Sequence, residues 1–294
     1  MIGNNNSRPR IACEVSAERV VAARAAESAR VLEAVSTRNL APGTVTPGLQ
    51  HANVAVRDAL VTAVRDVLSS VTLRSHDITL VIPDASTRIL LLDFDTLPDK
   101  VQDADSVVRF RLKKSLPFDV DASAVSFDRY AVANGVRVVA AVTPRTVLEE
   151  FEAAARDAGY NPGAVLPSMI AALGVVDGAR PTMVIKVETG TTTFAIVDQN
   201  QLLLYRSLEN GGVAVTGDSL VDDVNTSLVY FEDRYGISVE RLLVTGVQSA
   251  QSLHAAFSAS NIRVEELVSS SLATAAAGSV SRSAVAGVAG ALVS

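Results

Sequence analysis

The sequence predicts an α/β protein with mixed sheets, built from two halves that begin alike. Segments with strand and helix patterns alternate along all 294 residues, which is typical of this class. A strand–turn–strand pattern opens near residue 11 and again near residue 183, so we expect two related halves. The balance of 48% hydrophobic and 20% charged residues is that of a globular chain with a substantial core, and it argues against global disorder.

The first half begins with two short strands and an amphipathic helix. Residues 10–15 and 19–24 are mostly apolar and predict two strands, and residues 16–18 form the turn between them. Residues 41–50 are rich in proline and glycine and predict a loop. From 56 to 68 the apolar residues recur at helical spacing, with charged residues off that stripe.

The middle of the chain adds three strands and a helix. Two strands between residues 78 and 94 flank a turn, and a third strand follows near residue 140. The hydroxyl of Thr143, followed by Pro144, predicts an N-cap and a first helical residue. Gly159 is expected to end this helix.

The second half repeats the opening pattern. Residues 183–197 read as strand, turn and strand, and the turn is rich in glycine and threonine. Apolar spacing predicts a helix over 218–235, a strand over 241–246 and a helix over 249–257.

Composition and spacing argue against several kinds of function. The net charge is −6, no long basic run occurs and aromatic residues are 4%, so no nucleic-acid surface is expected. Cys13 is the one cysteine, which excludes a disulfide framework and favours a buried strand residue over a catalytic thiol. His51, His76 and His254 have no ligand spacing, so no metal site is expected. The start of the chain lacks a signal-peptide pattern, and apolar residues 283–294 are too few to span a bilayer, so we expect a cytoplasmic chain.

Several segments, in their order and spacing, carry a family resemblance. They are "RFRLKKSLPFDVDASAVSFDRYAV" (109–132), "VRVVAAVTPRTVLEEFEAAARDAGYNPGAV" (136–165) and "DSLVDDVNTSLVYFEDRYGISVERLLVTG" (218–246). Together with the doubled strand–turn–strand pattern, they resemble the type IV pilus assembly protein PilM family of the actin-like ATPase superfamily. The resemblance covers nearly the whole chain, from about residue 10 to residue 294.

The resemblance implies an actin-like (ribonuclease H-like) two-lobed α/β fold. Its parts would be subdomain 1A, a 1C-type insertion, a domain 2 with a reduced subdomain 2B, and a C-terminal helix that returns to 1A. The expected bounds are 1–85 and 163–182 for 1A, 86–162 for the 1C-type subdomain, 183–282 for domain 2 and 283–294 for the helix.

The first phosphate loop of that family departs from its pattern in this chain. The family reads about D-I-G-S-S-S-hydrophobic-K, and this chain reads "EVSAERVV". Glu14 therefore stands at the aspartate, Ser16 at the glycine and Val21 at the lysine, with Ala17 in the same turn.

The second phosphate loop departs further. The family reads about D-I-G-A-x-x-T-T, and this chain reads "KVETGTTT". Lys186 replaces the aspartate and Glu188 replaces the glycine, whereas Thr192 and Thr193 remain and Gly190 lies between.

Two more nucleotide elements are altered. The adenosine loop keeps Gly246, but Val247 stands where a further glycine is usual. After Gly211 and Gly212 the chain reaches the Asp218 helix within a few residues, so most of the small helical subdomain with its ribose-binding element is expected to be deleted.

These changes point to a degenerate nucleotide site. A side chain takes the space that glycine leaves for phosphate, Glu188 adds negative charge, and Lys186 repels magnesium. We expect no cofactor, with ATP and magnesium as the alternative. We also expect Glu14 and Lys186 to form an ion pair across the cleft. In the alternative, Lys186 extends to solvent at a strand edge.

The function that the resemblance implies is a non-hydrolysing cytoplasmic scaffold of a type IV pilus or type II secretion platform. Its partner would be the N-terminal peptide of a PilN-like membrane protein, in a groove between 1A and 1C whose residues the sequence does not assign. Membrane contact would occur only through that partner, and self-association is possible. Two alternatives are an ATP-binding regulatory PilM-like protein with weak or no turnover and a GspL-like cytoplasmic domain.

Overall fold

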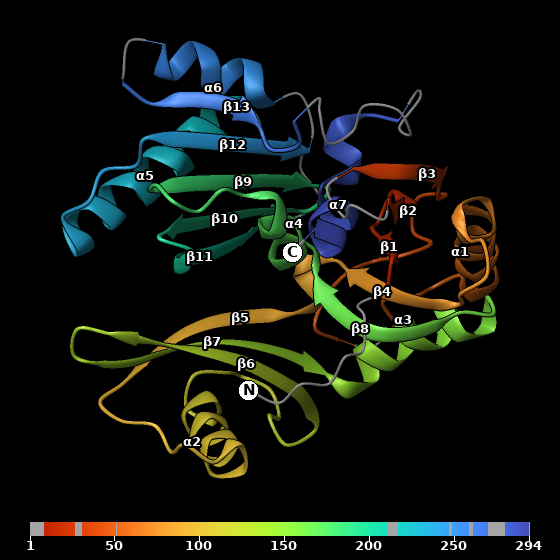
Figure 1. Ribbon diagram of the computed structural model, residues 1–294, viewed down its shortest axis with the longest axis horizontal. Helices are drawn as coiled ribbons and strands as arrows, with labels where there is room; N and C mark the ends of the chain where they lie inside the picture. The colour runs from red at the N-terminus through yellow and green to blue at the C-terminus, as the bar shows by residue number, and fades with distance from the viewer. Residues whose placement is uncertain are drawn as a thin grey trace.

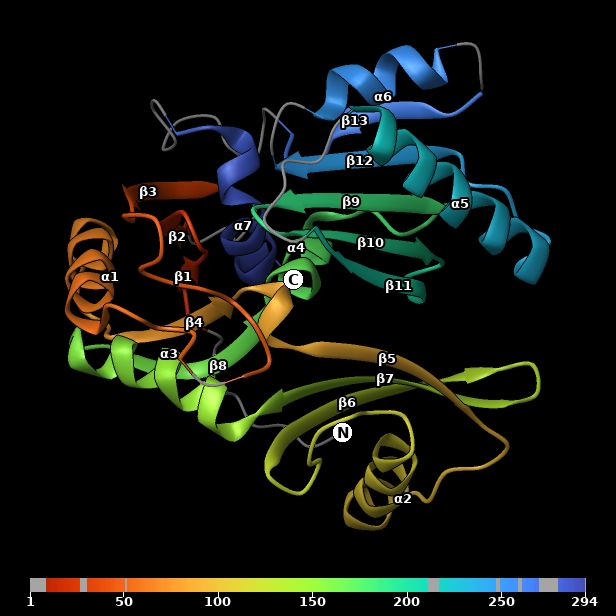
Figure 2. The ribbon, with the colours of Figure 1, turned by 180° about the vertical axis from the view of Figure 1, so that it is seen from behind.

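The computed structural model describes residues 9–26, 31–50, 52–210, 217–246, 249–258, 261–269 and 280–293. Two lobes, each built on a five-stranded sheet, meet around a central pair of helices, and a smaller sheet lies against both (Figures 1 and 2).

The first lobe is a mixed sheet in the order β3-β2-β1-β4-β8. β1, β2 and β3 are antiparallel neighbours, whereas β4 runs parallel to both β1 and β8. Helices α1 and α3 cover the outer face, where their apolar stripes pack on the odd-numbered residues of β1. The elements are β1 (Ile11–Val15), β2 (Arg19–Ala25), β3 (Leu32–Asn39), α1 (Arg57–Val71), β4 (Asp77–Ile82), α3 (Arg145–Asp157) and β8 (Asn161–Pro167).

The second lobe repeats this plan. Its sheet has the order β11-β10-β9-β12-β13. When the five strands of each lobe are numbered along the chain, both sheets have the same order, 3-2-1-4-5. The predicted pair of similar halves is therefore confirmed. Helices α5 and α6 lie on the outer face of this sheet (Figure 1). The elements are β9 (Thr182–Glu188), β10 (Thr191–Asp198), β11 (Gln201–Glu209), α5 (Gly217–Tyr235), β12 (Arg241–Gly246), α6 (Ser249–Phe257) and β13 (Arg263–Glu266).

The third unit is a three-stranded antiparallel sheet with one helix, which we call the inserted unit. Its strands follow the order β5-β7-β6, and α2 packs on one face through Val108 and Leu112. On the other face, Arg137 of β7 donates to Asp93 of the neighbouring strand β5 at 2.5 and 3.0 Å. Arg137 also reaches the second lobe, where it donates to the Tyr235 hydroxyl at 3.1 Å. The elements are β5 (Arg88–Phe94), α2 (Val101–Lys113), β6 (Ser123–Val132) and β7 (Gly135–Pro144).

Two boundary expectations need correction. The inserted unit was expected to extend to residue 162, but α3 packs on α1 and β8 pairs with β4, because their apolar residues complete the core of the first lobe. The N-cap expectation at Thr143 is also wrong. Thr143 belongs to β7, where its hydroxyl lies 2.8 Å from that of Thr87, and α3 begins at Arg145 with Pro144 as the N-cap residue.

The centre of the molecule is formed by α4 (Ser168–Ala172) and α7 (Ala286–Val293), with the short helical turns η1 (Asp84–Ser86), η2 (Leu173–Val175) and η3 (Arg282–Val285) beside them. α7 contacts α4, β1 and β2, and its residues share one apolar core with both sheets. Gly290 makes this packing possible, because a Cβ there would overlap the carbonyl oxygen of Ala171 on α4. Among the described residues, no helix is both long enough and apolar enough to cross a membrane.

We expect Gly290→Ala to destabilise the protein by about 1 to 3 kcal/mol, because the added methyl group forces α7 away from α4 in a packed core. Chemical denaturation measures the loss. Gly48→Ala is the matched control, since a Cβ at Gly48 meets no atom within 4 Å. Equal stability of the two variants would contradict the close packing of α4 and α7.

Candidate functional site

The candidate site is a cleft between the lobes, at the carboxyl ends of β1, β4 and β9. Parallel strands end at the same edge of a sheet, and in open α/β sheets ligands bind outside that edge. The cleft has a volume of about 1140 Å³ and is lined by both phosphate-loop segments, including Glu14, Ser16, Ala17, Lys186 and Glu188.

Strand alternation brings Glu14 and Lys186 together. Ile11, Cys13 and Val15 face the outer helices of the first lobe, so Glu14 points inward from β1. Lys186 points inward from β9 in the same way, and its Nζ lies 3.7 Å from Glu14 Oε1. The Glu14 side chain is 8% exposed and the Lys186 side chain is 6% exposed, so Lys186 does not extend to solvent.

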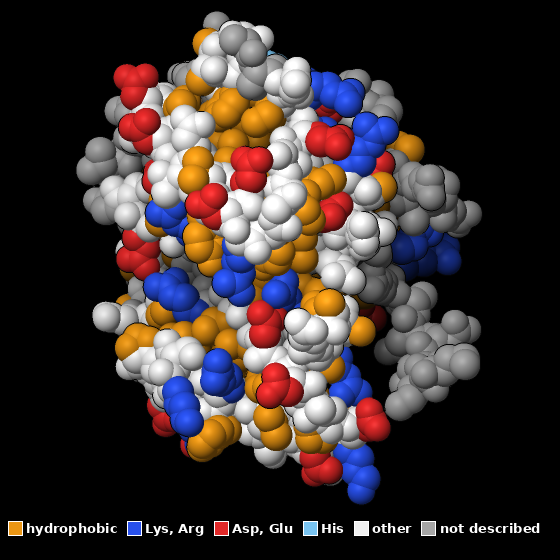
Figure 3. Space-filling view, turned by 90° about the vertical axis from the view of Figure 1, so that its left-hand side faces the viewer, with side chains coloured by type: hydrophobic (Ala, Val, Ile, Leu, Met, Phe, Trp, Pro, Cys, Tyr) orange, Lys and Arg blue, Asp and Glu red, His pale blue; other side chains and the backbone are white. Residues whose placement is uncertain are grey.

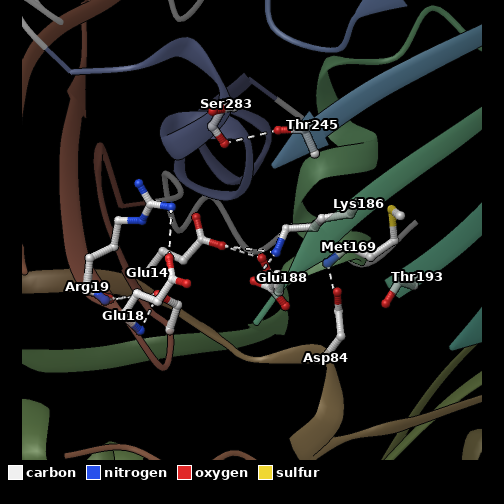
Figure 4. A network of polar contacts seen from close by, with 12 residues as sticks. Glu14, Glu18, Arg19, Asp84, Met169, Lys186, Glu188, Thr193, Thr245 and Ser283 are labelled. Atoms are coloured by element: carbon white, nitrogen blue, oxygen red, sulfur yellow. Dashed lines mark hydrogen bonds and ion pairs between the residues drawn. The ribbon is translucent and has the colours of Figure 1, made fainter. Parts of the chain in front are cut away.

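Glu188 is the nearer partner of Lys186. The ammonium group donates a hydrogen bond to Glu188 Oε1 and forms an ion pair with it (Figure 4). Glu14 in turn accepts a hydrogen bond from the hydroxyl of Ser168 on α4. The sequence indicated the pairing of Lys186 with Glu14, but it missed Glu188 as a partner of Lys186 and Ser168 as a partner of Glu14.

Asp84 adds a third carboxylate that the sequence analysis did not single out. It follows β4 and is 1% exposed, and its Oδ1 accepts hydrogen bonds from Met169 N at 2.8 Å and the Tyr205 hydroxyl at 3.4 Å. Its Oδ2 has no hydrogen-bond partner among the described residues. Its place after a predicted strand could have identified Asp84 as a site residue, because Asp84 and Glu14 both lie at the carboxyl ends of neighbouring parallel strands.

Burial and mutual repulsion alter the acidity of these groups. Burial raises the pKa of Asp84 to about 7, opposed by the positive charge of Lys186 and assisted by Glu188 and Glu14. Burial also raises the pKa of Glu14. For Lys186, burial acts to lower the pKa, but the three nearby carboxylates outweigh it and raise the pKa. Lys186 therefore stays charged at neutral pH and acts as the fixed cation of this cluster.

The remaining residues of the two loops lie in different surroundings. The hydroxyl of Ser16 donates to the carbonyl of Arg19 at 3.0 Å and closes its own turn, beside Ala17. Gly190 lines the cleft with a φ of +84°, a conformation that favours glycine. Across the cleft, the hydroxyl of Thr189 donates to the Glu18 carboxylate, a bridge the sequence did not suggest.

The threonines shared with the family pattern do not line the cleft. Thr192 and Thr193 are each 1% exposed within β10. Thr192 Oγ1 accepts from Asn210 Nδ2 at 3.0 Å, and Thr193 Oγ1 lies 3.5 Å from Ser207 Oγ. Gly246 does line the cleft, with a φ of +100°, and a Cβ there would overlap the Val187 carbonyl.

Three further predicted positions fall outside the described residues. They are Gly211, Gly212 and Val247. The neighbouring elements are described: β11 ends at Glu209 and α5 begins at Gly217.

The cluster does not fit a magnesium-bound nucleotide. The ammonium of Lys186 stands where the family resemblance implies a magnesium-side carboxylate, and it is already paired with Glu14 and Glu188. Within the described ranges, no group of three histidine, cysteine, aspartate or glutamate side chains could hold a metal ion. Cys13 is buried in β1, and burial raises the pKa of its thiol, which makes it an unreactive core residue.

The other end of the cleft is apolar and lies between the first lobe and the inserted unit. Its wall is the loop between β3 and α1, together with residues 117 and 118. The loop is held in place: Glu150 of α3 accepts from Ala52 N at 2.9 Å and Val54 N at 2.8 Å, and Asn53 Oδ1 accepts from Ser86 Oγ at 2.9 Å. The apolar lining residues include Leu40, Val45, Pro47, Leu49 and Phe118. We call this part the apolar groove.

Two lobes of the same strand order around one cleft define the class: the chain has an actin-like ATPase fold, as the resemblance implied. A structure from Bacteroides thetaiotaomicron, described as a protein with an actin-like ATPase fold and unknown function, superposes with a TM-score of 0.50 at 11% identity, over 87% of this chain and 89% of that one. Within this class, the chain is similar to a PilM–PilN type IV pilus biogenesis complex, with a TM-score of 0.76 over 97% of each chain at 17% identity.

A third structure is also similar. It is the cytoplasmic domain of EpsL, an inner membrane component of the type II secretion system of Vibrio cholerae, with a TM-score of 0.52 at 7% identity over 80% of each chain. At these identities the similarity establishes the fold. No protein-family model matches this sequence, and no curated protein matches it.

Proposed function

We propose that this chain is a PilM-like scaffold that neither binds nor hydrolyses ATP. The observation that carries the proposal is the buried Lys186 ammonium, held between Glu14 and Glu188 in the cleft. A magnesium–phosphate group entering there would meet a fixed cation and two carboxylates, and it would have to break a buried ion pair.

The scaffold role rests on the apolar groove. In this proposal the groove receives the N-terminal peptide of a PilN-like membrane protein of a type IV pilus or type II secretion platform. The similarity to a PilM–PilN complex supports a PilN-like partner. An extended peptide there would use backbone hydrogen bonds together with pockets for alternate side chains. The chain would then act in the cytoplasm, at the inner membrane, through this partner.

Titration with ATP and magnesium tests the absence of nucleotide binding. We expect no saturable binding of a fluorescent ATP analogue and no phosphate release, because Lys186 and Glu188 exclude the metal and the phosphates. Magnesium-dependent turnover that disappears in a folded Thr191→Ala variant, whose changed residue lines the cleft, would favour the ATP-binding regulatory alternative instead.

Fluorescence anisotropy with a labelled N-terminal peptide of a PilN-like protein tests the groove. We expect binding that Leu49→Glu and Phe118→Glu each weaken about tenfold or more, because each places a charge in an apolar wall. Leu73→Glu is the matched control, since Leu73 is 74% exposed and lies outside the cleft. Binding that survives both groove variants would place the peptide elsewhere.

The second candidate function is a GspL-like domain of a type II secretion platform, favoured by the similarity to the EpsL cytoplasmic domain. The same anisotropy assay separates the two: a PilN-like peptide binds in the first case and does not bind in the second.

A further inference from the structure

The helical turn η1 joins the buried cluster of the cleft to the wall of the apolar groove. It spans Asp84–Ser86, so its first residue belongs to the cluster and its last residue lies two positions further along the same short turn. The hydroxyl of Ser86 donates to Asn53 Oδ1 at 2.9 Å, and both of these residues are buried. A displacement of η1 therefore affects the cluster and the groove together.

Asn53 in turn holds the wall of the groove. Its Oδ1 also accepts from Gly48 N at 2.8 Å, and its Nδ2 donates to the carbonyl of Gln50. Residues 48–50 all belong to the lining of the cleft. Glu150 of α3 holds the other end of the loop. The part of the wall around residues 48–50 is thus joined to η1 through this buried amide.

Asp84 is set apart from the acidic side chains at the surface. Figure 3 shows one face of the molecule, where acidic side chains lie among basic and hydrophobic ones and are open to solvent. Asp84 is instead 1% exposed, and its Oδ2 has no hydrogen-bond partner among the described residues. A buried oxygen without a partner costs more free energy when it carries negative charge than when the carboxyl group is neutral.

Titratable groups from three strands act on Asp84. Lys186 of β9 favours the charged form, whereas Glu188 of β9 and Glu14 of β1 oppose it. Tyr205 of β11 remains a neutral donor, because burial raises the pKa of its hydroxyl well above the usual value. The neighbouring elements α4 and β8 contain no titratable side chain. Burial has the largest effect, and it raises the pKa of Asp84 to about 7. Two arginines act one step further out, on Glu14 and on Tyr205: Arg19 and Arg88.

We propose that loss of the Asp84 proton displaces η1 and loosens the wall of the apolar groove. The displacement lets water reach Oδ2, which relieves the cost of a buried charge without a partner. Ser86 moves with η1 and weakens its contact with Asn53, so residues 48–50 are held less firmly. The groove is well formed while Asp84 is neutral and loosened when it is charged. The consequence for a docked peptide, weaker binding at higher pH, rests on the proposed function.

Hydrogen exchange at the Gly48 amide tests the loosening without any peptide. Protection is the exchange rate of a free chain divided by the measured rate at the same pH. We expect protection in the native protein to fall about tenfold between pH 6 and pH 8, because the neutral fraction of a carboxyl group with a pKa near 7 falls by this factor. Asp84→Asn should keep its protection over this range. The matched control Asp95→Asn removes an exposed carboxylate and should respond like the native protein.

Two further variants locate the response. Ser86→Ala removes the hydroxyl that reaches Asn53, so Gly48 protection should no longer depend on pH, while the free energy of unfolding still falls with pH as in the native protein. His51→Gln removes a titratable side chain of the same loop, at a position outside the described residues, and should leave the response unchanged. Constant Gly48 protection in the native protein overturns the proposal. A response that persists in Ser86→Ala or disappears in His51→Gln also overturns it.

Fluorescence anisotropy then measures the consequence for docking. The probe is the PilN-like peptide, labelled at its C-terminal end, acetylated at its N-terminus and free of histidine, so that the peptide does not titrate between pH 6 and pH 8. We expect it to bind the native protein about tenfold more weakly at pH 8 than at pH 6, and to bind Asp84→Asn equally at both. Equal binding to the native protein at both pH values overturns the link between η1 and the groove. Absence of binding at both, with a Gly48 amide that still responds, contradicts the proposed function and supports this inference.

Discussion

Replacing Lys186 with methionine is expected to lower the free energy of unfolding by about 3 to 5 kcal/mol. The ammonium lies beside three buried or half-buried carboxylates, Glu14, Asp84 and Glu188. Removing one partner of a buried ion pair leaves uncompensated charge in a region of low dielectric. Urea denaturation monitored by circular dichroism measures the loss at neutral pH.

The matched control is Lys100→Met, because Lys100 is exposed and should change stability by less than about 1 kcal/mol. Adding Glu188→Gln to Lys186→Met should recover part of the loss, since the partner charge is removed as well. If Lys186→Met behaves like Lys100→Met, the cluster does not hold the lobes together.

The stability of the protein is expected to fall as pH rises from about 4 to about 7. In the folded state burial raises the pKa of Asp84 from 3.8 to about 7. Between these values the folded state binds more protons than the unfolded state, so the free energy of unfolding decreases with pH. A shift of about three pKa units corresponds to roughly 4 kcal/mol. The raised pKa of Glu14 acts in the same direction.

Denaturation curves at several pH values measure this slope, and Asp84→Asn should flatten it. An asparagine oxygen can still accept from Met169 N and the Tyr205 hydroxyl, so the variant should be more stable than the native protein above pH 7. The control Asp95→Asn removes an exposed carboxylate and should leave the slope unchanged. A native protein with constant stability across this range contradicts the burial of an ionisable Asp84.

Local patterns predicted the strands and helices of the lobes well, because each pattern depends on short-range chemistry. The alternation around Cys13 and Glu14 and the apolar stripe of α5 depend on near neighbours in sequence, and the structure shows both. The failure at Thr143 has a tertiary cause: its hydroxyl contacts Thr87, and strand pairing extends through Pro144. The preference of threonine for the N-cap position depends on neighbouring residues and cannot predict a contact with Thr87, which is distant in sequence.

The candidate site could be predicted only in part, because some of its contacts join residues that are distant in sequence. Glu14 and Lys186 were recognised because the loop pattern repeats, but Asp84 belongs to no repeat and is assembled into the cluster by the sheet. Gly287 is a second example: a Cβ there would overlap the Glu14 carboxylate, so a glycine about 270 positions away in sequence leaves room for this side chain. Thr192 and Thr193 match the family pattern, yet they face neighbouring strands.

The position of α7 in the core of the first lobe affects how that lobe folds during synthesis. Its buried face completes the core above β1 and β2, so the first strands to be synthesised lack one covering layer until residues 286–293 emerge. At 5 to 20 residues per second, this delay is roughly 15 to 55 seconds. During synthesis, Ala12 and Val21 would therefore expose an apolar sheet face, and the first lobe should reach its native protease resistance only after translation has passed α7.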